Sequence, residues 1–171
     1  MMRAALSHYA LSCGLLLLPA AAWNIVLGNH LPPAFQRKEF WRDIPAPLAV
    51  AENGLRLGVF VLPFLMPLDP ATQGSARAFF IFGAGTLLYF ASWLALIWRP
   101  GSRWSRCPLG FAAPAYTPLI WLLGIALLSD RLVWGTFYQW WMYLVLCVAF
   151  LAAHITHTML VYFRNFQPGA D

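Results

Sequence analysis

Residues 76–98 read ARAFFIFGAGTLLYFASWLALIW, an apolar stretch in which Arg77 is the only charged side chain. A helix that crosses the hydrocarbon core of a membrane needs roughly 17–25 mainly apolar residues. This stretch meets that length, and four further stretches of similar character surround it. Together they predict an all-α polytopic bundle of about five transmembrane helices, at residues 4–28, 48–68, 76–98, 109–129 and 132–163.

The composition supports the same class of protein. Of the 171 residues, 61% are hydrophobic and only 10% are charged, whereas soluble proteins carry about a quarter charged residues. We therefore expect a single transmembrane domain over residues 1–171, in a multi-pass protein of a bacterial inner membrane. The net charge is +5, but the basic residues fall mainly in two short loops, which is typical of topology signals that face anionic lipid. A nucleic-acid partner is not indicated.

Prolines and polar residues divide the apolar stretches. The segment between the first two predicted helices, residues 29–47, mixes basic and aromatic side chains and is either a short helix in the headgroup region or an ordinary charged loop. Pro63 predicts a kink, tolerated where a neighbouring helix satisfies the freed carbonyl. Pro114 and Pro118 predict irregular first turns in the fourth helix. The fifth predicted helix would be about 48 Å long, so it must tilt or project from the membrane.

The distribution of basic residues predicts the orientation. Cytosolic segments of membrane proteins carry an excess of Lys and Arg. With the N-terminus outside and the C-terminus cytosolic, seven such residues face the cytosol, namely Arg37, Lys38, Arg42, Arg99, Arg103, Arg106 and Arg164. The opposite orientation leaves only three there, namely Arg3, Arg77 and Arg131.

In this topology, scattered polar residues of three helices share one depth, in or near the cytosolic leaflet. Ionisable groups are costly in hydrocarbon, so each is a candidate functional residue. We predict that they line one connected cavity and bind a ligand there; the set comprises Asn24, Glu52, Asn53, Arg56, His154 and His157.

Two spacings within this set matter. Glu52 and Arg56 are four residues apart, which suits an ion pair within one helix. His154 and His157 are three residues apart and share one helix face. In the plainer interpretation, Arg56 extends back to the headgroups and the histidines form hydrogen bonds within the bundle.

Three functions fit this pattern. The first is binding of a membrane lipid or small hydrophobic ligand, or of a helix from a membrane-protein partner, at a polar pocket in the cytosolic leaflet. The second is an intramembrane enzyme that acts on a lipidic or isoprenoid substrate, with Glu52, His154 and His157 as catalytic acid and base. The third is a small transporter.

Motifs for nucleotide, haem or zinc binding are missing, and we expect neither a cofactor nor a metal. The isolated residues Cys13, Cys107 and Cys147 predict free thiols that pack as small apolar side chains.

Overall fold

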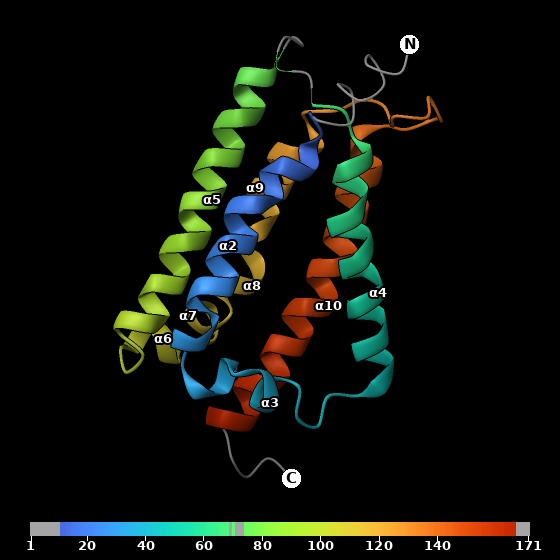
Figure 1. Cartoon of the computed structure of the whole chain (residues 1–171). Coiled ribbons are helices and arrows are strands. Elements are labelled where there is room, and N and C mark those ends of the chain that lie inside the picture. Colours follow the sequence, from blue (N-terminus) through green and yellow to red (C-terminus); the bar gives the residue numbers. More distant parts are fainter. Residues whose placement is uncertain (1–10, 69, 71–73, 167–171) are drawn as a thin grey trace.

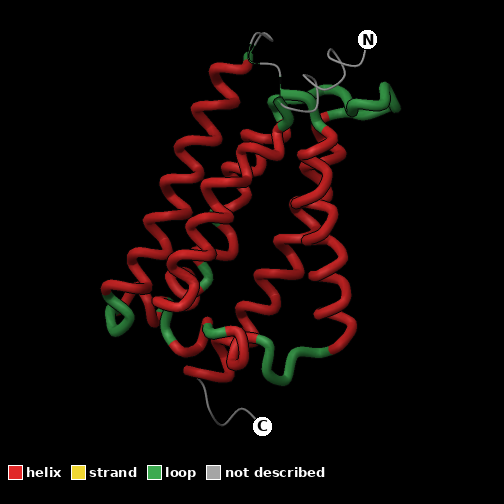
Figure 2. Tube along the Cα trace, in the orientation of Figure 1, coloured by secondary structure: helices red, strands yellow, loops and turns green. Residues whose placement is uncertain are grey.

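A computed structural model describes residues 11–68, 70 and 74–166 of the chain. Every regular element in this part is a helix, and the only strand-like pairing is one isolated bridge between Ser12 and Pro67. Figure 2 shows the loops gathered at the two ends of a helical bundle. The predicted all-α fold is therefore confirmed. Residues 4–10 of the first predicted helix lie outside the described residues.

Among the described residues, four helices are long and apolar enough to cross a membrane, and a fifth apolar segment is shorter. The long ones are Cys13–His30, Ala46–Leu65, Ser75–Trp98 and Trp140–Phe166, and the shorter one is Ala113–Ala126. The chain is thus a multi-pass membrane protein. In detail the first helix comprises η1 (Cys13–Leu17), α2 (Leu18–Leu27) and η2 (Gly28–His30), and the second comprises α4 (Ala46–Val61) and η4 (Leu62–Leu65).

The helices pack in two pairs that α10 connects. α5 (Ser75–Trp98) packs along α9 (Pro118–Ala126), while α10 (Trp140–Phe166) packs against both α4 and α9 (Figure 1). One end of the bundle carries η3 (Pro33–Phe35), α3 (Arg37–Phe40), α6 (Arg103–Arg106) and the last turns of α10. Residues 66–68, which follow η4, and the loop after α9 lie at the opposite end.

Proline divides the fourth apolar segment, as the sequence predicted. It consists of α7 (Pro108–Phe111), α8 (Ala113–Tyr116) and α9, and each of these helices has a proline in its first two positions. Proline lacks an N–H group and clashes with the preceding turn, so it starts a helix but does not continue one. The breaks leave room between this segment and its neighbours.

The fifth predicted helix begins later than expected. We predicted residues 132–163, but residues 132–139 are not helical and α10 starts at Trp140. Gly135 has a positive φ of 66°, a conformation that interrupts a right-handed helix. The 27 residues of α10 span about 40 Å, so the helix still exceeds a hydrocarbon core of about 30 Å.

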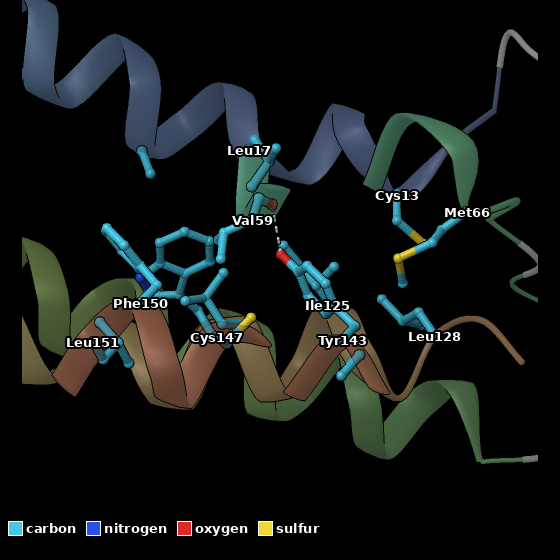
Figure 3. Close-up of a cluster of buried hydrophobic side chains, with 14 of the residues drawn as sticks. Cys13, Leu17, Val59, Met66, Ile125, Leu128, Tyr143, Cys147, Phe150 and Leu151 are labelled. Carbon is cyan, nitrogen blue, oxygen red and sulfur yellow. Dashed lines mark hydrogen bonds between the residues drawn. The ribbon is translucent and has the colours of Figure 1, made fainter. Parts of the chain in front are cut away.

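Pro63 lies in a tightened last turn of the second helix, and the kink predicted there stays a prediction. α4 ends at Val61 and continues as the 3-10 segment η4, which contains Pro63. Proline at this position cannot donate to the Val59 carbonyl one turn earlier. The Tyr143 hydroxyl on α10 donates to that carbonyl at 3.0 Å (Figure 3). A neighbouring helix therefore satisfies the group that Pro63 leaves free.

Candidate functional site

Glu52 lies at the centre of the polar cluster that the helices α4 and α10 build. Its side chain is fully buried, and its carboxylate contacts three donors. Arg56, one turn along α4, forms an ion pair with Oε1. Across the interface, His154 Nδ1 lies 2.9 Å from Oε1 and His157 Nδ1 lies 2.5 Å from Oε2. A buried carboxylate is stable only with such partners.

The hydrogen bonds of His157 define where one proton must be. Its Nε2 lies 2.9 Å from the backbone carbonyl of Phe40, which can only accept, so Nε2 carries a hydrogen. Its Nδ1 faces Glu52 at 2.5 Å, and two bare lone pairs at that distance would repel. One proton therefore lies between Glu52 and His157, on the carboxylate or on the imidazole.

His154 is the member of the cluster that reaches an open space. Its Nδ1 donates to Glu52, its side chain is 23% exposed, and it lines a cavity. The Phe150 ring stacks on it with centroids 5.5 Å apart. Within the described part of the chain, Nε2 of His154 has no hydrogen-bond partner. This nitrogen can consequently interact with a bound molecule.

Arg56 forms a wall between two concave regions. Its guanidinium carbon lies 5.7 Å from the centre of the Trp41 ring and 5.8 Å from that of Phe150. The side chain is 34% exposed, and one of its nitrogens lies 3.4 Å from Asn53 Oδ1. These cation–π contacts with two rings add to the ion pair with Glu52 in holding the long side chain in place.

The cavity has a volume of about 370 Å³ and an apolar lining. It lies between the broken fourth segment and the helices α2, α4, α5 and α10, and η3 and α3 close one side. Its polar lining residues are Asn24, Arg56, Tyr89, His154 and Thr158. Its other lining residues are aliphatic or aromatic, and include Phe40, Phe60, Trp93, Ala115, Trp121 and Phe150.

The structure divides the six residues predicted to line one cavity. Asn24, Arg56 and His154 line it, and Asn24 accepts a hydrogen bond from the Tyr89 hydroxyl at 2.7 Å. Glu52 and His157 are fully buried and do not line the cavity; Glu52 contacts the lining residues Arg56 and His154, and His157 contacts the lining residue Phe40.

Asn53 is exposed on another face of α4. Its amide donates to the Ala49 carbonyl at 2.8 Å, and it lines a separate depression. A ligand-binding role for the six residues stays a prediction.

The contacts that hold the segment 37–43 against the site were not identified from the sequence. The Phe40 carbonyl accepts from His157, and the Phe40 ring packs against the same imidazole with centroids 4.2 Å apart and ring planes tilted by 31°. Arg164, near the end of α10, donates to the carbonyls of Glu39 and Arg42. Backbone acceptors leave no signature in a sequence; the only available signal was the placement of Arg164 and the segment at the same predicted depth.

The described residues contain no group of three His, Cys, Asp or Glu side chains arranged to hold a metal ion. Both Nδ1 atoms of the histidine pair are already directed at Glu52.

Neither a protein-family model, nor a curated protein, nor a solved structure matches this chain. Function is therefore inferred from the geometry of the site.

Proposed function

We propose that this protein binds a lipid or another small hydrophobic molecule in the cavity beside His154 and Arg56. It would do so as an integral protein of a bacterial inner membrane, with the N-terminus outside and the C-terminus cytosolic. The excess of basic residues at the end of the bundle that carries α3 and α6 supports this orientation. A helix of a partner protein is the alternative occupant, and the same experiment distinguishes the two.

The observation that carries the proposal is a mainly apolar cavity with a few polar side chains in its lining. Its volume of about 370 Å³ falls within the roughly 300–1,000 Å³ typical of small-molecule sites. Such sites are mainly apolar, with a few polar groups that fix the orientation of the ligand. His154 and Arg56 supply these groups here, and the buried Glu52 holds both in place.

The test is native mass spectrometry of the purified protein, which detects a retained small molecule by its mass. Ala115 lines the cavity and is buried, so Ala115→Leu should fill part of the space and reduce ligand retention. Ala91→Leu is the matched control, because Ala91 is exposed on α5. A wild-type protein that carries no ligand, or equal retention by both variants, would contradict the proposal. Retention of a polypeptide would identify a partner helix instead.

A second candidate function is acid–base catalysis on a molecule in the same cavity. The specific observation in its favour is the pairing of His154 Nδ1 with Glu52, which leaves Nε2 at the cavity wall. A carboxylate that orients an imidazole in this way is a common arrangement for a general base. In this arrangement His154 would touch the substrate. Glu52 and His157 would not touch the substrate and would instead hold the His154 side chain in position.

His154→Asn tests this alternative. The asparagine amide can replace the Nδ1 donor to Glu52, but it has no counterpart of Nε2. If the protein is an enzyme, this variant should retain the molecule identified by mass spectrometry and fail to convert it. An unchanged molecule after incubation with the wild-type protein would leave binding as the function.

A further inference from the structure

A second concave region lies on the far side of Arg56 from the cavity. It is an open depression of about 890 Å³, lined by Arg37, Lys38, Trp41, Asn53 and Arg56. Three of these five side chains are cationic, and Asn53 adds an amide. We call this region the basic depression.

The acidic residues near the basic depression are already engaged. Arg42 lies 2.8 Å from Glu39 and 3.6 Å from Asp43, so both acids of this segment are paired with a cation next to them. Glu52 is fully buried against Arg56 and the two histidines. Arg37 and Lys38 are exposed, and no ion pair is found for either of them among the described residues. The basic depression therefore presents a positive charge that the protein itself does not compensate.

The basic depression and the apolar cavity share one wall. Arg56 lines both, held between Trp41, which belongs to the depression, and Phe150, which belongs to the cavity. A molecule with an apolar chain in the cavity would thus bring a polar end to Arg56 and the depression beside it. An amphiphile matches this pairing, because its chain needs apolar walls and its headgroup needs charged partners.

We propose that Arg37, Lys38, Asn53 and Arg56 bind the anionic phosphate headgroup of an amphiphile whose chain occupies the cavity. This inference rests on the proposed function and names its ligand class. A phosphate ester offers several acceptor oxygens, and Arg and Lys bind such groups through charge-assisted hydrogen bonds. A headgroup with net negative charge is preferred over a zwitterionic one, since the depression has no free acid to meet a positive group.

The experiment compares two lipids with identical acyl chains, phosphatidylglycerol and phosphatidylcholine, by native mass spectrometry of the purified full-length protein. The wild-type protein should retain phosphatidylglycerol preferentially. Removal of one basic side chain near an anionic surface weakens binding by about fivefold, so the double variant Arg37→Gln/Lys38→Gln should lose about tenfold or more of the preference. The matched control is Arg99→Gln/Arg103→Gln, which removes two exposed basic residues at the same end of the bundle, outside the depression.

Each outcome supports or overturns the inference. The inference is supported if Arg37→Gln/Lys38→Gln loses the preference for phosphatidylglycerol while the control Arg99→Gln/Arg103→Gln keeps it. Equal retention of both lipids by the wild-type protein overturns the headgroup site and leaves the proposed function standing. Retention of neither lipid, with no other ligand found, overturns both.

A further arm adds inorganic phosphate alone. The inference of an amphiphile is overturned if phosphate binds as strongly as phosphatidylglycerol and Ala115→Leu does not change its binding. The basic depression would then bind a free anion.

Discussion

Glu52 Oε2 and His157 Nδ1 lie 2.5 Å apart, although 105 positions separate the two residues in the chain. The contact joins α4 to α10 inside the bundle and extends through His157 Nε2 to the Phe40 carbonyl. One carboxylate thereby connects two transmembrane helices and the segment that crosses their ends.

Substitutions of Glu52 should separate the effect of its charge from that of its hydrogen bonds. In Glu52→Gln, the amide oxygen can accept from Arg56 and His154 while the amide nitrogen donates to a neutral His157, so we expect a loss of stability below about 1 kcal/mol. Glu52→Ala leaves three polar side chains without their shared acceptor and should cost about 3–5 kcal/mol. Unfolding in detergent, followed by circular dichroism, measures both.

Arg56→Ala should fall between the two Glu52 variants. It removes one donor from a buried carboxylate that keeps two histidine partners, and so it should be more harmful than Glu52→Gln. If Glu52→Ala were no less stable than the wild-type protein, the cluster would contribute nothing to the fold.

The contacts of Arg164 should keep the segment 37–43 ordered. Its guanidinium donates to the carbonyls of Glu39 and Arg42, and a hydrogen bond from a charged donor contributes about 1.5–3 kcal/mol. Arg164→Ala should therefore speed amide hydrogen exchange in residues 37–43 by about tenfold or more. Asn165→Ala is the control, because Asn165 bonds only within its own helix, to the Val161 carbonyl. Equal exchange in the two variants would show that Arg164 does not hold the segment.

Matched depth in the membrane was sufficient to predict that residues of α4 and α10 meet. Glu52, Arg56, His154 and His157 do form one cluster. The depth of a residue in the membrane does not, however, define the direction in which its side chain points from the helix. Successive residues of a helix point about 100° apart, so Asn53 cannot share the face of Glu52 and instead lines the basic depression. A finer use of the helical period would have separated these two neighbours.

Other parts of the site could not be predicted from the sequence. The acceptor for His157 Nε2 is a backbone carbonyl, and its position depends on the path of a segment whose structure the sequence left open. The start of α10 was predicted eight residues early, at 132 in place of 140. Apolar residues continue through the loop at 132–139, so hydropathy gave no sign of the boundary, and only Gly135 marked it.

Two glycines should be essential for the contact between α5 and α9. A Cβ atom on Gly124 would lie 2.6 Å from the Phe82 backbone nitrogen, and one on Gly85 would collide with the backbone at Trp121. Gly85→Ala and Gly124→Ala should therefore each destabilise the protein by about 1–3 kcal/mol.

Gly83 is the control for these two variants. Gly83 lies only two residues from Gly85 on the same helix, but a Cβ atom there would meet nothing within 4 Å. Gly83→Ala should leave the unfolding temperature unchanged or raise it, because alanine is the better helix former. A loss of stability in Gly83→Ala as large as in Gly85→Ala would contradict the packing described here.

The last prediction concerns the Tyr143 hydroxyl and the carbonyl that Pro63 leaves free. Tyr143→Phe removes the donor to Val59 and leaves a buried carbonyl unsatisfied, which should cost about 1–2 kcal/mol. Pro63→Ala restores an N–H group that can bond the same carbonyl within α4. Tyr143→Phe should therefore cost less stability in the Pro63→Ala background than in the wild-type protein. The double variant should lose less stability than the sum of the losses in the two single variants. A double-mutant cycle of unfolding free energies in detergent measures this coupling.

Tyr162→Phe provides the comparison, because Tyr162 donates to the Arg106 carbonyl at 3.0 Å, far along the chain from Pro63. Tyr162→Phe should cost the same stability with or without Pro63. If the losses of Tyr143→Phe and Pro63→Ala were also additive, the Tyr143 hydroxyl would not replace the donor that Pro63 lacks.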